Sequence, residues 1–326
     1  MAPRPRDVVV VGASAGGVEA LRTMVAGLPA DLRASVLVVL HMPAGGTSAL
    51  PAILNRVGTL PATVARNGEP LEYGRIYVSR PDHHLLVMDN SVALSHGPTE
   101  NGHRPAINAL FRSAAVARGA SVTGVLLSGV LDDGVAGLHA IVGRGGRVVV
   151  QDPDDALYRS MPDHALRAVT PDHVVPAFEI GDVLGKISTE NAEPANHIAP
   201  ELLRWENEIA SVGWTAEGAE PVGTPSEFSC PDCQGVLSDI DRGRRYRCRV
   251  GHAWTSEALL AAQGSALERA LWTALRSLEE KTALTLRMAK RARERGNQAI
   301  AGRYDQLARE TTEAGEVLRQ LIARSE

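Results

Sequence analysis

Short runs of apolar residues alternate with stretches of helical periodicity over the first 187 residues of the chain. The apolar runs lie at residues 8–11, 35–40, 125–127 and 147–150. Helical patterns separate them at residues 17–27, 106–117 and 135–142. Continuous apolar runs rich in valine are typical of parallel strands that are buried on both faces. The pattern therefore predicts an α/β fold with a doubly wound, mainly parallel sheet.

A hairpin-like stretch is expected in the middle of this region. Three short apolar segments follow one another closely, at residues 75–78, 85–87 and 92–94. Polar and turn-forming residues separate the segments, as is usual between neighbouring strands. We therefore expect these strands to pair mainly with one another.

The rest of the chain divides into three parts. Residues 188–227 are acidic and contain several Pro and Gly residues, which predicts a linker with one short helix near residues 200–212. Residues 228–255 hold a cysteine cluster among several arginines. Residues 256–326 contain no proline and are rich in Ala, Leu, Glu and Arg. This last part predicts two helices that break near Gly296 and Asn297.

The second of these helices carries a heptad pattern. Its apolar or small residues recur at alternating spacings of four and three, namely Ile300, Tyr304, Leu307, Thr311, Ala314, Leu318 and Leu321. Two helices packed only on each other cannot bury such seams along their whole length. We therefore expect a helical hairpin or coiled-coil segment with a partner surface, and self-association through these helices is one way to supply it.

Composition and charge narrow the class of protein. The chain has 326 residues, of which 44% are hydrophobic and 22% are charged, and its formal net charge is −4. This balance gives no overall attraction to nucleic acid, so no DNA partner is expected. Neither a signal peptide nor an apolar stretch of about 18 residues is present, so we expect a cytoplasmic protein without membrane insertion. Three clustered cysteines argue against a disulfide framework and for a reducing compartment.

The strongest chemical signal follows the first apolar run. Residues 12–16 read Gly-Ala-Ser-Ala-Gly and fit the G-x-S-x-G pattern between a predicted strand and a predicted helix. Small residues allow a sharp turn that exposes the hydroxyl of Ser14, and the helix N-terminus offers N–H groups to a developing oxyanion. The alternative is a phosphate-binding turn, but the dinucleotide pattern G-x-G-x-x-G fails because Ser14 replaces its second glycine.

A nucleophilic serine needs a base and a carboxylate. His41 follows the second predicted strand directly, although a lone histidine there can also be satisfied by the backbone. Asp132 and Asp133 follow the strand at residues 125–127 and precede Gly134, so either can reach the same sheet edge. An Asp before Gly is also a common turn and helix-cap pattern. The residues alone leave these alternatives open.

A second site is indicated by the cysteines. Cys230 and Cys233 form a C-x2-C pair, and Cys248 with His252 forms a C-x3-H pair fourteen residues later. This set supplies four ligands at tetrahedral zinc spacing and leaves no position open for water. A structural zinc in a ribbon-like module at residues 228–255 is therefore expected, and three free thiols in a small β module are the alternative.

These motifs together resemble the catalytic domain of the chemotaxis protein-glutamate methylesterases, the CheB type, across residues 5–187. The matching segments are GASAGG at 12–17, HMPAGGTSAL at 41–50, GRIYVSRPDHHLLV at 74–87, NGHRPAINALFRSAA at 101–115, LLSGVLDDGVAGL at 126–138 and the stretch 145–166. The resemblance implies a methylesterase catalytic domain over residues 1–187. It places the catalytic serine, histidine and aspartate on Ser14, His41 and Asp133, an order that differs from that of ordinary α/β-hydrolases.

The resemblance further implies an activity without a catalytic cofactor. The enzyme would hydrolyse glutamate methyl esters on the cytoplasmic helices of chemoreceptors, and side-chain amides as well. Backbone N–H groups near Ala15 and Val130 would hold the oxyanion, and His103 and Arg104 would line the mouth of the site. Two features depart from the family pattern. Val130-Leu131 stands where the family usually has Met-Gly, and the chain begins at the first strand of the esterase, without room for a receiver domain.

Two other hypotheses remain. The same triad can act on esters or amides of a protein outside chemotaxis. Alternatively, the zinc module and helices can serve a signalling scaffold in which the hydrolase domain is a docking unit. The presence of all three triad residues favours an enzyme.

Overall fold

A computed structural model describes residues 4–46, 48–192, 198–212 and 223–324. The chain separates into two compact units, Met1–Leu259 and Leu260–Glu326. Two stretches of the expected acidic linker, residues 193–197 and 213–222, lie outside the described residues. Among the described residues, no helix combines the length and the apolar character that a membrane span requires.

The first unit is built on a seven-stranded sheet with the order β10-β9-β8-β2-β3-β5-β4, and all its neighbouring strands are parallel. The strands are β2 (Val8–Ala13), β3 (Ser35–Leu40), β4 (Ala62–Val64), β5 (Arg75–Val78), β8 (Val122–Leu126), β9 (Arg147–Gln151) and β10 (His173–Val175). The chain order reverses at β2, which pairs with β3 on one side and β8 on the other. The carboxyl ends of these three strands therefore meet at a topological switch point, where open α/β sheets place functional groups.

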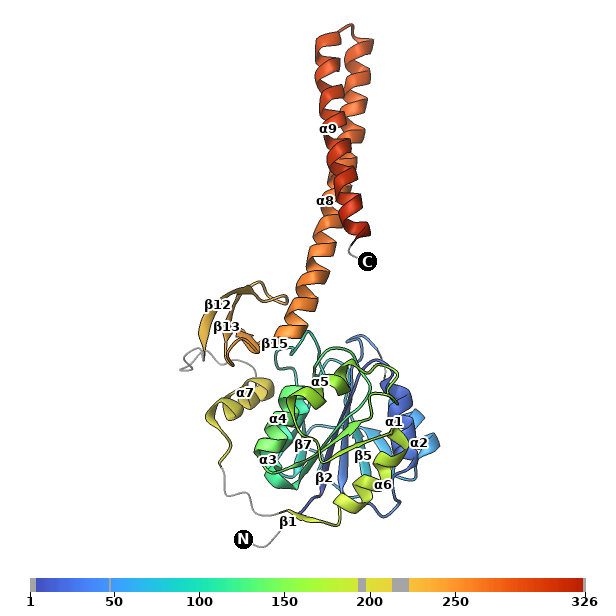
Figure 1. The fold of residues 1–326 in the computed structure, drawn as a ribbon, viewed down its shortest axis with the longest axis vertical. Helices are drawn as coiled ribbons and strands as arrows, with labels where there is room; N and C mark the ends of the chain where they lie inside the picture. The colour runs from blue at the N-terminus through green and yellow to red at the C-terminus, as the bar shows by residue number, and fades with distance from the viewer. Residues whose placement is uncertain (1–3, 47, 193–197, 213–222, 325–326) are drawn as a thin grey trace. The chain divides into compact units, whose positions relative to one another are not determined.

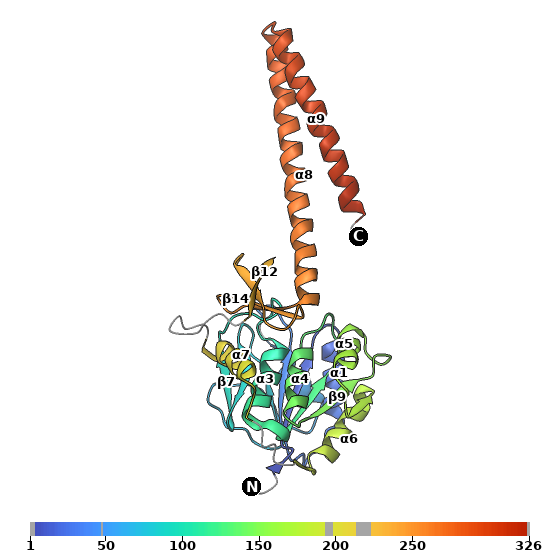
Figure 2. The same ribbon diagram turned by 60° about the vertical axis from the view of Figure 1, so that its left-hand side comes forward.

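Helices cover both faces of this sheet (Figures 1 and 2). One face carries α1 (Gly17–Ala26), α2 (Leu50–Val57) and α6 (Ala177–Ile187), and the other carries α3 (Ile107–Arg118), α4 (Val135–Gly143) and α5 (Ser160–Ala168). Alternate valines of β2 enter opposite cores, Val9 and Val11 on one side and Val8 and Val10 on the other. Burial on both faces explains why these strands read as uninterrupted apolar runs, and the predicted α/β class is confirmed.

The expectation for residues 75–78 is wrong in one respect. This segment is the parallel strand β5 of the main sheet, and the antiparallel hairpin consists only of β6 (His84–Met88) and β7 (Ser91–Ser95). Ile76, Tyr77 and Val78 are fully buried, which requires a sheet covered on both faces. β6 and β7 are instead joined by the tight turn Asp89-Asn90, in which Asp89 adopts a φ of 52°.

The remaining elements of the first unit lie around this core. β1 (Arg4–Pro5) pairs with β11 (Asn191–Ala192), and the short η1 helix (Gly119–Ser121) precedes β8. The predicted linker helix is α7 (Glu201–Val212). A four-stranded antiparallel sheet follows, made of β12 (Thr224–Ser229), β13 (Val236–Asp239), β14 (Arg245–Cys248) and β15 (Ala253–Thr255). This sheet begins at Thr224, inside the stretch that the sequence assigns to the linker, and we call residues 224–255 the Cys3His module.

The C-terminal residues form the two predicted helices, α8 (Ser256–Glu294) and α9 (Gln298–Ala323). Gly296 turns the chain with a φ of 76°, and the Asn297 side chain caps α9 by accepting a hydrogen bond from the N–H of Ile300 at 3.1 Å. Cross-helix pairs such as Thr282–Thr311 and Glu279–Arg319 show that the two helices run antiparallel.

The predicted heptad seam is correct at Thr311, but at most of its other positions the buried residue is the next one along the chain. The buried positions of α9 are Ala301, Ala308, Thr311, Gly315 and Ile322, whereas Ile300 and Leu321 are 43% and 47% exposed. Small residues at the contact let two helices approach closely, so the interface follows the stripe of Ala, Thr and Gly rather than the larger side chains. This leaves apolar side chains of both helices at the surface of the described residues, including Trp272, Leu284 and Val317.

Candidate active site

Ser14 lies in the sharp turn between β2 and α1. Its backbone N–H donates to the carbonyl of Ser128 at 3.0 Å, and its own carbonyl accepts from Gly17 at 2.9 Å. Gly16 precedes the helix in a left-handed conformation, with a φ of 71°. A Cβ on Gly16 would lie 2.7 Å from the Ser128 hydroxyl, so both the conformation and the space require glycine. The small residues of the motif thus hold the Ser14 hydroxyl at the carboxyl edge of the sheet.

His41 follows β3 and faces Ser14. Its Nδ1 lies 3.1 Å from Ser14 Oγ, and its Nε2 lies 2.8 Å from Asp133 Oδ2. In the triad of serine proteases, Nε2 faces the nucleophile and Nδ1 faces the carboxylate. The His41 ring has the reverse orientation, with Nδ1 toward Ser14 and Nε2 toward Asp133. The side chains of His41 and Asp133 are only 8% and 3% exposed, so little water competes for these hydrogen bonds.

Asp133 is held at the N-terminus of α3. Its carboxylate accepts the backbone N–H groups of Ile107 at 2.8 Å, Asn108 at 3.2 Å and Gly134 at 3.0 Å. Burial by itself raises the pKa of Asp133, but the hydrogen bond and charge of His41, together with the other donors, bring this pKa below its usual value. The carboxylate therefore stays ionised beside His41.

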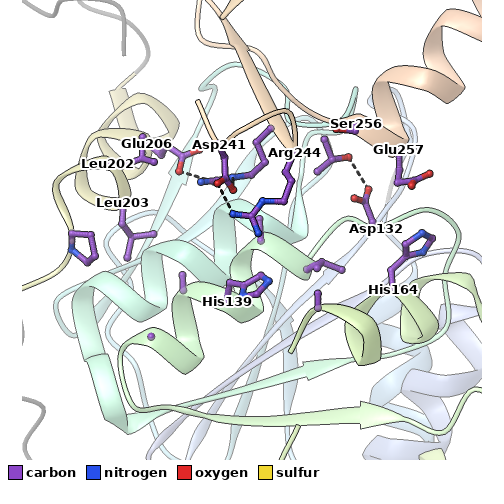
Figure 3. Close-up of a pocket in the computed structure, with 18 of the residues that line it drawn as sticks. Asp132, His139, His164, Leu202, Leu203, Glu206, Asp241, Arg244, Ser256 and Glu257 are labelled. Carbon is purple, nitrogen blue, oxygen red and sulfur yellow. Dashed lines mark hydrogen bonds and ion pairs between the residues drawn. The ribbon is translucent and has the colours of Figure 1, made fainter. Parts of the chain in front are cut away.

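Asp132 points away from this arrangement, and the structure separates the two adjacent aspartates. Its Oδ1 accepts the hydroxyl of Thr255 at 2.7 Å, and burial raises its pKa. Asp132 also lines a cavity of about 730 Å³ between α4, α5, α7 and the Cys3His module, a cavity that Ser14, His41 and Asp133 do not line (Figure 3).

Two backbone N–H groups near Ser14 in the chain or in the fold remain available: that of Ala15, the next residue, and that of Val130, which follows Gly129, whose Cα lies close to the Ser14 side chain. Within the described part of the chain, the N–H groups of Ala15 and Val130 donate no hydrogen bond. The neighbouring Leu131 adopts a φ of 59°, a conformation that favours glycine. The turn that a glycine usually forms at this position is thus adopted by leucine, with local strain of about 1–2 kcal/mol.

The two predicted mouth residues have different surroundings. The ring of His103 stacks on that of His41, with centroids 3.8 Å apart and an interplanar angle of 16°. Burial, with the neighbouring His41, lowers the pKa of His103 to about 4, so this ring is neutral near pH 7. Arg104 instead binds Asp82 through two nitrogens, at 2.7 and 2.9 Å, and donates to the carbonyl of Gly97. Arg104 therefore braces the loop that carries His103.

Several residues of the site carry no signal that the sequence alone reveals. The Asn108 side chain accepts the N–H groups of Gly134 and Gly137, at 3.1 and 2.8 Å, and fixes the turn that carries Asp133. The Ser128 hydroxyl donates to the carbonyl of Ala15 at 2.8 Å and so braces the turn that carries Ser14.

The four predicted metal ligands lie together in the Cys3His module. Their ligand atoms are all within 4.8 Å of one another. Cys233 Sγ is 3.7 Å from Cys248 Sγ, and His252 Nδ1 is 3.7 Å from Cys230 Sγ and 3.5 Å from Cys248 Sγ. Tetrahedral zinc with Zn–S of about 2.3 Å and Zn–N of about 2.0–2.1 Å separates neighbouring ligand atoms by about 3.5–3.8 Å. The donor set and its spacing therefore fit a zinc ion.

Curated relatives match the first part of the chain. A protein-glutamate methylesterase/protein-glutamine glutaminase of Methanosarcina mazei is 35% identical over 190 residues, which are 56% of this chain and 52% of that protein. A protein of the same description from Geobacter metallireducens is 37% identical over 192 residues, 58% of this chain and 55% of that protein. The chain thus spans about half the length of the curated relatives that it matches.

A solved structure and a family model match the same region. The crystal structure of the Thermotoga maritima CheB methylesterase catalytic domain superposes with a TM-score of 0.53 at 29% identity, over 55% of this chain and 97% of that domain. The model of the CheB methylesterase family matches residues 9–184, which run from the second residue of β2 to Leu184 in α6. The switch-point turn that carries Ser14 thus lies within a match to more than half of the chain, and the protein belongs to the CheB methylesterase family.

Proposed function

We propose that this protein is a protein-glutamate methylesterase that uses Ser14, His41 and Asp133 as a catalytic triad. The observation that carries the proposal is the continuous hydrogen-bonded series from Ser14 Oγ through both nitrogens of His41 to Asp133. The names of the relatives from Methanosarcina mazei and Geobacter metallireducens support the same reaction.

Acylation begins with attack of Ser14 Oγ on the side-chain carbonyl of a glutamate methyl ester. His41 Nδ1, at 3.1 Å, takes the proton of the hydroxyl, while Nε2–H remains hydrogen-bonded to Asp133. Asp133 stabilises the imidazolium and stays ionised, as its lowered pKa requires. The free N–H groups of Ala15 and Val130 hold the oxyanion of the tetrahedral intermediate.

The second half of the reaction reverses these roles. His41 returns the proton to the leaving oxygen, methanol departs, and a glutamyl ester on Ser14 remains. His41 then takes a proton from water, the hydroxide attacks the ester, and glutamate is released with the Ser14 hydroxyl restored. The same steps on a glutamine side chain release ammonia, and the second part of the relatives' name favours this amidase activity as an additional function.

The substrate and the location follow from the reaction. We assign the methylated cytoplasmic helices of chemoreceptors, or a similar signalling protein, as the partner, and a cytoplasmic location for the enzyme. The exposed apolar side chains of α8 and α9, among them Trp272 and Val317, support self-association through these helices. A purely scaffolding role would give no reason for the Ser14–His41–Asp133 geometry.

We assign a structural zinc ion to Cys230, Cys233, Cys248 and His252. The Cys233–Cys248, Cys230–His252 and Cys248–His252 separations match those of a tetrahedral site, and a set of four ligands leaves no position for a reactive water. Zinc would stabilise the Cys3His module, and the triad needs no cofactor for the ester hydrolysis.

The Ser14→Ala variant is expected to fold normally and to lose at least about 10³-fold in kcat, because the nucleophile is absent. Methanol release from a methylated receptor fragment measures this loss, and a fluorophosphonate probe should label the unmodified protein at Ser14. Ser91→Ala, which removes a hydroxyl in the β6–β7 turn, is the matched control and should retain full activity. Near-normal methanol release by Ser14→Ala would refute the mechanism.

The adjacent aspartates provide a second test. Asp133→Asn should lower kcat by about 10³–10⁴-fold, because it favours the wrong imidazole tautomer and removes the charge. Asp132→Asn should cost no more than about tenfold, because its remaining oxygen still accepts the Thr255 hydroxyl. Steady-state kinetics on both variants decide between them. If Asp132→Asn, rather than Asp133→Asn, shows the large loss in kcat, the assignment of Asp133 is wrong.

Metal analysis tests the zinc assignment. Protein prepared without chelator should carry one zinc per chain, and Cys230→Ser should release it while the α/β domain keeps its cooperative thermal unfolding. Asp232→Asn is the matched control, since Asp232 lies between two ligands but faces Thr99, and it should keep its zinc. Metal-free protein from such a preparation would contradict the assignment.

A further inference from the structure

The Cys3His module pairs with the loop that carries His103. The N–H of Ala253 in β15 donates to the carbonyl of Thr99 at 3.1 Å, and the N–H of Asn101 donates to the carbonyl of Ala253 at 2.8 Å. The Asn101 side chain also accepts the N–H of Thr255 at 2.8 Å. Residues 99–101 therefore extend the sheet of the module beyond β15, although they belong to the catalytic domain by sequence.

A buried network of charges fixes the position of this pairing. Glu100 binds Arg112 of α3, while Arg247 of β14 lies 3.5 Å from Glu100 and 3.1 Å from Glu206 of α7. All four side chains are at most 4% exposed. Burial alone raises the pKa of Glu100, but Arg112 and Arg247 lower it to about 2, so the carboxylate remains charged. Because Arg247 belongs to the module, a shift of the module would remove a buried cationic partner from both Glu100 and Glu206, which is unfavourable.

Arg247 also connects this network to the metal-ligand loop. It precedes the ligand Cys248, and its NH1 donates to the carbonyl of Gly251 at 2.6 Å, directly before the ligand His252. The position of the Arg247 guanidinium thus depends on the turn that closes the cysteine and histidine cluster. Metal binding to that cluster would hold the turn, and with it the partner of Glu100.

Glu100 in turn positions His103. The N–H of Glu100 donates to the carbonyl of His103 at 3.1 Å, and the N–H of His103 donates to the carbonyl of Glu100 at 2.9 Å. Asn101 and Gly102 between them have φ values of 53° and 73°, which describe a tight turn. This turn places the His103 ring against the ring of His41, and so limits how far His41 can rotate away from Ser14.

A second contact reaches the other side of the triad. The hydroxyl of Thr255 donates to Asp132 at 2.7 Å, and Figure 3 shows Asp132 at the pocket beside the module. In the sequence, Asp132 lies between the strained Leu131 and the triad residue Asp133. The module therefore touches both loops that flank His41, one through Glu100 and one through Asp132. The contacts of the module with these two loops are buried and polar, and such contacts require a defined geometry.

We propose that the Cys3His module is a positioning element of the esterase, in which Arg247 and Thr255 hold the loops around His41 and the metal-loaded module sets the catalytic rate. This inference rests on the proposed function of Ser14, His41 and Asp133. Neither Arg247 nor Thr255 contacts the reacting atoms, so both act through other residues. The module differs in this role from a tether that only brings the enzyme to its substrate.

Thr255 offers the sharpest test in the full chain. Thr255→Val keeps the shape and the backbone N–H but loses the hydroxyl, and should lower kcat by about 10- to 100-fold with little change in KM, because a small misplacement of catalytic groups costs this much. Thr255→Ser retains the hydroxyl and should restore the rate. Ser226→Ala, which removes a hydroxyl bound to Leu237 inside the module, should leave kcat unchanged. Zinc content should be one per chain in all three.

The labelling rate of Ser14 by a fluorophosphonate separates this inference from the proposed substrate. Labelling should slow in Thr255→Val and in chelator-treated protein, and zinc should restore it in the latter. Unchanged labelling and kcat would show that the module does not position the triad, and a faster rate would show that it restrains the enzyme. If the probe labels Ser14 but the protein does not hydrolyse glutamate methyl esters, only the proposed substrate is wrong. A chain that never labels refutes both proposals.

Discussion

The buried carboxylate of Asp133 is the interaction on which the arrangement of the site depends. An ionised carboxylate that is 3% exposed costs several kcal/mol unless donors surround it. Here the N–H groups of Ile107, Asn108 and Gly134 and the ring of His41 supply those donors. Because the donors come from α3, the turn after β8 and the end of β3, satisfying one charge fixes three elements relative to one another. Ser14, in the short turn after β2, then completes the hydrogen-bonded series of Ser14, His41 and Asp133.

The Cys3His module is attached by a different kind of contact. Its interface with the catalytic domain contains the ion-pair network of Glu100, Arg112, Glu206 and Arg247, and such networks contribute little net stability because each charge must first lose its water. Their effect is on geometry, since any other placement leaves a buried charge without a partner. A module held in this way has one favoured position, and that property suits a positioning element better than a loose linker does.

The sequence predicts those features that depend on neighbouring residues. The valine runs predict the buried strands, the small residues around Ser14 predict the turn, and the cysteine spacing predicts a cluster that the structure brings together. Features that depend on contacts between distant segments were not predictable. The residues alone leave Asp132 and Asp133 equivalent. Contacts with distant segments separate them, because Asp133 accepts the N–H groups of Ile107 and Asn108, whereas Asp132 accepts the hydroxyl of Thr255. For the same reason the sequence pattern places residues 75–78 in a hairpin-like stretch. It also puts most of the α9 seam one residue before the positions that are buried, although Thr311 belongs to both sets.

Leu131 links these observations. A glycine at this position adopts a left-handed φ without cost, but it also leaves the turn free to take other conformations in the unfolded and native states. Leucine at a φ of 59° is strained, so it stays there only if the residues on either side hold it. Asp133 is held from one direction by α3, and Asp132 is held from the other by Thr255 of the Cys3His module. The departure at Leu131 and the presence of the module are therefore related physically, because the module supplies a contact that stabilises a turn which glycine would form without support.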